Sequence, residues 1–124
     1  MPRSVLVVDD SPTIRGFARL ILRALDVTVL EAEDGAKALA AARATPPALV
    51  LADVNMPVMD GLSLTRELRK DRALKDIPVL LLTGEKSDEL QRQGLAAGAN
   101  ALLTKPLQAA ELQAAVRRWL GDPA

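Results

Sequence analysis

The sequence predicts an α/β fold, a doubly wound sheet of five parallel strands with helices on both faces. Short apolar runs alternate five times with longer amphipathic stretches along the 124 residues. This alternation indicates consecutive β–α units, because parallel strands need a crossover, usually a helix, between them. Three of the runs, Val5–Val8, Leu49–Ala52 and Val79–Leu82, are apolar throughout. Such continuous runs are typical of central strands that are buried on both faces.

The first β–α unit joins the strand Val5–Val8 to a helix over Pro12–Leu25. Ser11 provides a hydroxyl that can cap this helix, and proline is tolerated in a first helical turn. Six apolar residues then fall on one helical stripe, which indicates an amphipathic helix. They are Ile14, Phe17, Ala18, Ile21, Leu22 and Leu25.

Residues that end helices and form turns divide the rest of the chain. We expect the remaining strands at Val27–Leu30, Leu49–Ala52, Val79–Leu82 and Ala101–Thr104. We expect the remaining helices at Gly35–Ala44, from the end of the loop Asp53–Gly61 to about Lys70, at Ser87–Ala97 and at Leu107–Leu120. Pro46 and Pro47 end the second helix, and Gly98 ends the fourth. Pro78 opens the fourth strand, while Glu31 after the second strand indicates an edge position.

The composition limits the classes of function. The chain has no cysteine and no histidine, which excludes disulfides, zinc–thiolate centres and a phosphohistidine of its own. Any metal must therefore bind oxygen, which favours Mg²⁺, Mn²⁺ or Ca²⁺. Basic and acidic residues number 16 each, and no apolar run approaches the roughly 18 residues of a membrane helix. We expect one cytoplasmic domain over residues 1–124, with no nucleic-acid partner, no membrane insertion and no second domain.

Five polar residues stand where predicted strands end. They are Asp9, Asp10, Asp53, Thr83 and Lys105. Because ligands of doubly wound sheets bind beyond the carboxyl ends of the strands, we expect these side chains to share one site. Taken singly, each has an ordinary alternative, such as a solvated strand end, a helix cap, a turn residue or a surface lysine. Their coincidence at the ends of four strands favours a common site.

Three carboxylates, one hydroxyl and one ammonium suit a phosphoryl group and a hard divalent cation. Two unit charges 4 Å apart repel by about 4 kcal/mol at an effective dielectric constant of 20. Close carboxylates therefore need cations or raised pKa values, and Lys105 and a bound Mg²⁺ would supply the cations. In such a pocket Asp53 can act as a nucleophile that accepts a phosphoryl group, while Lys105 and Thr83 contact the phosphoryl oxygens.

The motifs around these residues resemble those of the response-regulator receiver domain, in particular its single-domain chemotaxis (CheY-like) type. The resemblance covers essentially the whole chain. It rests on Val-Val-Asp-Asp-Ser at 7–11, Leu-Ala-Asp-Val-Asn-Met-Pro-Val-Met-Asp-Gly at 51–61, Leu-Leu-Thr-Gly at 81–84 and Lys-Pro at 105–106. It implies the flavodoxin/CheY-like strand order 2-1-3-4-5 and a cis Lys105–Pro106 peptide.

The resemblance also implies a role for each residue of the site. Asp53 would be the phospho-acceptor. The implied ligands of Mg²⁺, or of Mn²⁺ in its place, are Asp9, Asp10, Asp53 and the backbone carbonyl of Asn55. The implied phosphoryl contacts are Thr83 and Lys105, and the residues that tune the lifetime of the phosphate are Asn55 and Glu85.

By the same resemblance, the chain is a two-component phosphorylation switch rather than an enzyme. A sensor histidine kinase or a histidine phosphotransfer protein would supply the phosphoryl group from a phosphohistidine. Phosphorylation would then change the affinity for a downstream protein partner. Two alternatives stay open: a receiver-like scaffold that binds without phosphate, and an aspartyl-phosphate hydrolase. The hydrolase is less favoured, because it would need a carboxylate where Asn55 stands.

One position departs from the family pattern. Receivers commonly carry Tyr or Phe three residues before the lysine, as a rotamer switch that follows the threonine on phosphorylation. Here that position is Leu102, and the chain has no tyrosine and one phenylalanine. We expect either a more modest switch between Thr83 and Leu102, or a signal that leaves by another surface.

A basic stripe runs along the first predicted helix, where Arg15, Arg19 and Arg23 recur every four residues. The residues alone are most simply interpreted as a solvated helix face. The resemblance adds a second hypothesis, a docking face for the phosphodonor, because members of the family often meet their kinase with this helix.

Overall fold

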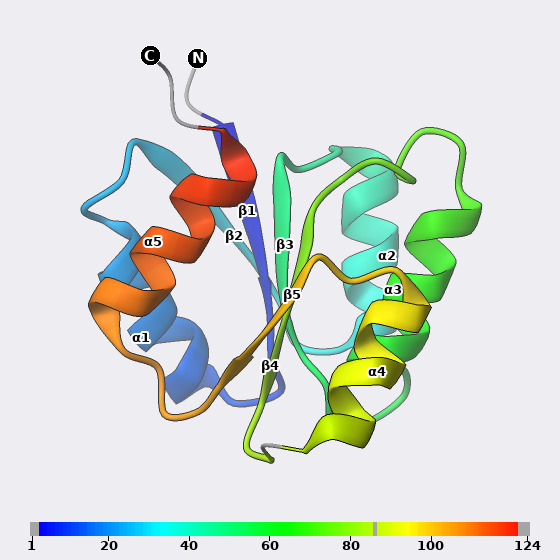
Figure 1. The fold of residues 1–124 in the computed structure, drawn as a ribbon. Helices are drawn as coiled ribbons and strands as arrows, with labels where there is room; N and C mark the ends of the chain where they lie inside the picture. Colours follow the sequence, from blue (N-terminus) through cyan, green and yellow to red (C-terminus); the bar gives the residue numbers. More distant parts are fainter. Residues whose placement is uncertain (1–2, 86, 122–124) are drawn as a thin grey trace.

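The computed structural model describes residues 3–85 and 87–121, along which strands and helices alternate (Figure 1). The strands are β1 (Arg3–Val8), β2 (Val27–Ala32), β3 (Leu49–Asp53), β4 (Val79–Thr83) and β5 (Ala101–Thr104). The helices are α1 (Pro12–Leu22), α2 (Gly35–Ala44), α3 (Gly61–Lys70), α4 (Asp88–Ala97) and α5 (Ala109–Leu120). Across these described residues, no helix has the length and apolarity that crossing a bilayer requires.

The five strands form one parallel sheet in the order β2-β1-β3-β4-β5. Figure 1 shows α1 and α5 on one face of the sheet and α2, α3 and α4 on the other. The predicted fold class, a doubly wound parallel sheet of order 2-1-3-4-5, is thereby confirmed.

Two apolar cores lie on opposite faces of the sheet, because the side chains of a strand alternate in direction. On β1, Leu6 and Val8 belong to the core beneath α2, α3 and α4, whereas Val5 and Val7 belong to the core beneath α1 and α5. Every residue of β3 and β4 is buried. The continuous apolar runs are therefore strands with a core on each side, and β2 lies at an edge, as Glu31 indicated.

Side-chain caps begin four of the five described helices at the carboxyl edge of the sheet. The accepting oxygens belong to Ser11, Asp34, Asp60 and Ser87. Each cap binds an amide that the first helical turn would leave without a partner. The caps also fix the direction in which the chain leaves each loop, and these loops carry the polar residues that the sequence singled out.

The clearest difference from the sequence prediction is the end of α1, which lies at Leu22 and not at Leu25. Because β2 begins at Val27, in register with Arg3, the chain must leave the helix and reverse direction before that residue. Leu25 still packs against the core, from a turn rather than from the helix. Phe17 lies at the margin of the apolar stripe and is 44% exposed. All other boundaries lie within two residues of the predicted ones.

A glycine in α4 makes room for a leucine of β5. A Cβ added at Gly94 would lie 2.5 Å from Cδ1 of Leu102, so any larger residue there requires Leu102 to move. By contrast, a Cβ added at Gly16 in α1 would meet nothing within 4 Å. Both glycines lie within helices, and a side chain has space at exposed Gly16 but not at buried Gly94.

We expect the substitutions Gly94→Ala and Leu102→Ala to be energetically coupled. In a helix interior, alanine is more favourable than glycine by about 1 kcal/mol. That gain should appear for Gly94→Ala only after Leu102 has been shortened, so a double-mutant cycle measured by urea unfolding should give a coupling of about 1 kcal/mol or more. Gly16→Ala combined with Leu102→Ala should be additive. Additivity at Gly94 as well would contradict the contact.

Candidate functional site

Four strands deliver polar residues to one edge of the sheet. Asp9 follows β1, Asp53 and Thr83 are the last residues of β3 and β4, and Lys105 follows β5. The sheet's hydrogen bonding continues past the strand ends: the amide of Asp9 donates to the carbonyl of Ala32 at 3.1 Å, and that of Lys105 to the carbonyl of Thr83 at 2.8 Å. The backbones of these residues are therefore held as firmly as the strands themselves.

Three carboxylates converge at this edge. Asp9, Asp10 and Asp53 each offer one oxygen, and these oxygens lie within 4.8 Å of one another. Asp9 and Asp53 are buried, with 1% and 6% of their surface exposed, while Asp10 is exposed. The structure thus brings together the three acids that the sequence singled out. An all-oxygen donor set of this kind suits Mg²⁺ or Mn²⁺.

Lys105 joins two of the three carboxylates. Its Nζ lies 3.2 Å from Oδ2 of Asp9 and 3.2 Å from Oδ2 of Asp53. The other oxygens accept from the backbone: Oδ1 of Asp9 from the Ser11 amide at 2.9 Å, and Oδ1 of Asp53 from the Asn55 amide at 3.3 Å. Both buried carboxylates are therefore fixed in orientation at each oxygen. The Lys105–Pro106 peptide is cis, as the resemblance implied.

The surroundings of Asp53 make its ionised form unfavourable. Burial raises the pKa of Asp53, the hydrogen bond from Lys105 opposes this in part, and the negative charge of Asp9 raises the pKa further. Burial alone would lower the pKa of Lys105, but its hydrogen bonds and attraction to Asp53 and Asp9 raise it above its usual value. Lys105 therefore stays charged, and the site keeps an excess of negative charge that an added cation would stabilise.

Thr83 is buried at the end of β4, and its hydroxyl is engaged with the next loop. It accepts from the Glu85 amide at 3.0 Å and donates to the Glu85 carbonyl at 3.2 Å. A hollow beside β4, α4 and β5 is lined by Thr83, Glu85 and Leu102, among others. The residues proposed to switch, Thr83 and Leu102, therefore share one hollow, while the predicted contact of Thr83 with a phosphoryl group stays a prediction.

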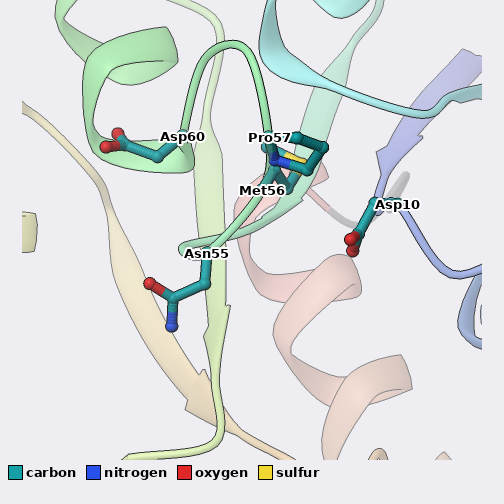
Figure 2. A pocket seen from close by; sticks show the side chains of 5 residues that line it. All are labelled: Asp10, Asn55, Met56, Pro57 and Asp60. Carbon is teal, nitrogen blue, oxygen red and sulfur yellow. The ribbon is translucent and has the colours of Figure 1, made fainter.

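A second hollow opens beside the acidic cluster. It is lined by Asp10, Asn55, Met56, Pro57 and Asp60. Figure 2 shows Asp10 on one side and the loop that follows β3 on the other. Asp60 does not belong to the acidic cluster, because its side chain accepts from the Ser63 amide at 2.7 Å and caps α3.

The basic stripe of α1 is tied to the rest of the fold and is not a purely solvated face. Arg15 and Arg19 both pair with Glu31 of β2, at 3.1 and 2.5 Å. Arg15 also donates to the backbone carbonyl of Asp9 at 2.6 Å. Arg15 thus supports the position of Asp9, a role that four-residue spacing cannot reveal because its partners lie on other elements.

Sequence reasoning also missed Gly61, the first residue of α3. Its amide donates to the carbonyl of Val54 at 3.0 Å, and a Cβ at this position would overlap the backbone oxygen of Asp53. The helix therefore begins in direct contact with the backbone of Asp53. Two signals were available: Gly61 ends the motif at 51–61, and it directly follows the capping residue Asp60, where a helix former is otherwise preferred.

Comparison with known proteins identifies this arrangement. Residues 5–117 match the family described as "Response regulator receiver domain". The chain belongs to this family. It is 44% identical to a gliding motility regulatory protein of Myxococcus xanthus over 101 residues, which are 82% of this chain and 13% of that protein. It is 38% identical over 122 residues to RpaA of Synechocystis, named a DNA-binding dual master transcriptional regulator; the match covers 97% of this chain and 49% of RpaA. The receiver chain thus spans half or less of these two relatives.

Solved structures similar to this receiver domain include a chemotaxis regulator. CheY4 of Vibrio cholerae is 36% identical, with a TM-score of 0.90, and the match covers 96% of this chain and 99% of CheY4. The receiver domain of the sensor histidine kinase PA1611 of Pseudomonas aeruginosa is 33% identical, with a TM-score of 0.89 and coverage of 98% and 100%. That structure has a magnesium ion coordinated in its active-site cleft.

We expect the raised pKa of Asp53 to make the folded protein less stable as the pH rises. Folded Asp53 binds its proton more tightly than the unfolded chain does. Its contribution to stability is therefore complete below the unfolded pKa of about 3.9 and is lost as the pH rises through the raised folded pKa. Asp53→Asn cannot ionise, so in metal-free buffer its free energy of unfolding should exceed that of the wild type at neutral pH. Urea unfolding should show this advantage shrinking towards about pH 4; an advantage independent of pH would contradict the assignment.

Proposed function

We propose that this receiver domain acts in the cytoplasm as a phosphorylation switch with Asp53 as the phospho-acceptor. The supporting observation is the position of Lys105, whose ammonium lies 3.2 Å from both Asp53 and Asp9 inside a cluster of three carboxylates. A nucleophilic carboxylate next to a fixed cation and a group of metal-binding oxygens is what phosphoryl transfer requires. The donor is a phosphohistidine of a sensor kinase or of a phosphotransfer protein, and this histidine must belong to another protein because the chain has none of its own.

In the transfer, an oxygen of Asp53 attacks phosphorus, and the bond between phosphorus and the donor's imidazole nitrogen breaks. The electron pair of that bond returns to the imidazole, and Asp53 becomes an acyl phosphate. Lys105 stabilises the negative charge of the transferred group, and Thr83 donates to one of its oxygens. Slow hydrolysis of the acyl phosphate by water resets the domain. The domain promotes its own phosphorylation in this way but turns over no separate substrate.

The donor set at this edge fits Mg²⁺, with Mn²⁺ as an alternative. Asp9, Asp10, Asp53 and the backbone carbonyl of Asn55 would hold the ion, and all four provide oxygen. When bound, the ion neutralises charge on the carboxylates and on the phosphoryl oxygens. Without it, burial and the neighbouring Asp9 already make the ionised Asp53 unfavourable.

The phosphorylated state differs from the resting state at Thr83. The phosphoryl group carries up to about two negative charges where the ionised carboxylate carried one, and its three acceptor oxygens compete for the hydroxyl that now bonds to Glu85. Leu102 lines the same hollow and would repack when Thr83 turns, so a downstream protein partner could distinguish the two states. Asn55 and Glu85, both exposed, would tune the lifetime of the phosphate. Asn55 stands where a hydrolase would need a carboxylate, which favours the switch over the hydrolase.

We expect Asp53→Asn to abolish the uptake of acid-labile phosphate from acetyl phosphate in the presence of Mg²⁺, because an amide lacks a nucleophilic carboxylate. Intact-protein mass spectrometry measures the uptake. Asp60→Asn is the matched control: it lies in the same loop, its amide still caps α3, and it should be phosphorylated like the wild type. Uptake by Asp53→Asn with unchanged Mg²⁺ dependence would assign the acceptor to another residue.

We expect Asp10→Asn to weaken Mg²⁺ binding by at least about tenfold, because the substitution removes one carboxylate from the donor set. Isothermal titration calorimetry with MgCl₂ measures the affinity directly. Asp10 is exposed and the substitution removes one negative charge from the cluster, so the variant should fold with unchanged or higher stability. Asp60→Asn should bind Mg²⁺ within about twofold of the wild type, and an equal loss in both variants would contradict the assigned ligands.

A further inference from the structure

The loop between β3 and α3 contains a backbone conformation that residues other than glycine rarely adopt. Val58 has φ 68°, and among residues 3–85 and 87–121 it is the sole non-glycine residue with positive φ. Its neighbours close a tight hydrogen bond, from the amide of Met59 to the carbonyl of Pro57 at 2.7 Å. A bond between residues two apart, around a positive φ, is the rare and strained form of the γ-turn. A β-branched side chain makes that conformation more costly still.

Contacts on both sides force the loop into this turn. The amide of Gly35, at the start of α2, donates to the carbonyl of Met59 at 3.0 Å, and a Cβ at Gly35 would lie 2.5 Å from that oxygen. The amide of Gly61, at the start of α3, donates to the carbonyl of Val54 at 3.0 Å. Two helix starts therefore hold the two sides of the loop. The valine side chain contributes little packing to the loop, because it is 84% exposed, so its effect on the loop must come through the backbone conformations that it allows.

The strained turn closes the segment that faces the acidic cluster. Asn55, Met56 and Pro57 line the hollow opposite Asp10, as Figure 2 shows. This segment is anchored at one end by the backbone bond at Val54 and at the other by the turn at residue 58. The place of the Asn55 carbonyl, the proposed metal ligand, therefore depends on both anchors.

We propose that Val58 is a positioning residue whose strained turn holds residues 55–57 against the acidic cluster and so preorganises the metal site. This inference rests on the proposed function, because the Asn55 carbonyl acts there as a ligand of Mg²⁺. A valine at positive φ has a narrow range of allowed conformations, whereas a glycine has a wide one. Glycine at residue 58 relieves the strain, but it also lets the segment sample conformations that metal binding must then exclude.

The test compares Val58→Gly and Val58→Ala with the wild type. Val58→Gly should keep or raise Tm, because it removes backbone strain, yet it should weaken Mg²⁺ binding by about three- to tenfold in titration calorimetry. Val58→Ala keeps a Cβ and the restricted φ, so it should bind Mg²⁺ within about twofold of the wild type. Hydrogen exchange at the Met59 amide, the donor of the turn, should be faster in Val58→Gly and unchanged in Val58→Ala.

Each other outcome overturns the proposal. Unchanged Mg²⁺ affinity in Val58→Gly would show that the strained turn does not contribute to metal binding. Equal weakening in Val58→Gly and Val58→Ala would make the exposed side chain, and not the backbone, responsible. A lower Tm together with weaker binding in Val58→Gly would reduce Val58 to an ordinary structural role. A wild-type protein that binds no Mg²⁺ would overturn the proposed function itself, and the wild-type titration alone distinguishes that case.

Discussion

Negative charge concentrated at the carboxyl edge of the sheet is the constraint around which this receiver domain is organised. Three carboxylates offer oxygens within 4.8 Å of one another, and two of these residues are buried. Unit charges at such a separation repel by several kcal/mol where water is partly excluded. Lys105 reaches Asp9 and Asp53, but one ammonium cannot neutralise three carboxylates. The remaining negative charge is what would attract a divalent cation. Lys105 and that cation together would stabilise the negative charge of a phosphoryl group bound to a carboxylate.

The sheet withstands this repulsion because the charged residues continue its hydrogen-bond ladders. The amides of Asp9 and Lys105 each bond to the neighbouring strand, and the amide of Val54 bonds to the carbonyl of Leu82 at 2.8 Å. Beneath them, β3 and β4 are buried along their whole length between two apolar cores. The core therefore holds the carboxylates together against their mutual repulsion. Functional sites of this kind are commonly less stable locally than the fold that carries them.

The features that were predictable from the sequence are those set by the hydrophobic pattern and by the place of a residue at the end of a strand. Continuous apolar runs identified the central strands, and the topology of a parallel sheet then placed Asp9, Asp53 and Lys105 at one edge. The features that were not predictable depend on contacts between distant segments. The early end of α1 follows from the register of β2 with β1, and the pairing of Arg15 with Glu31 joins residues of two elements. The positive φ of Val58 is imposed by contacts with the starts of two helices. It could not be predicted from the residue type, because valine rarely adopts a positive φ.

Leu102, where the family commonly has Tyr or Phe, changes how a signal could travel, because leucine has neither an aromatic ring nor the hydroxyl of tyrosine. A tyrosine could exchange a hydrogen-bond partner and either aromatic ring could change rotamer as a rigid plate, whereas Leu102 can only change its packing. Gly94 provides the space in which it packs, and the hollow in front of it is shared with Thr83 and Glu85. The amide and the carbonyl of Glu85 now both bond to the Thr83 hydroxyl. If this hydroxyl turned towards a phosphoryl group, the backbone of Glu85 would lose both bonds. In this chain the change presented to a partner would therefore lie in the shape of that hollow and in the Glu85 loop, rather than in a single aromatic rotamer.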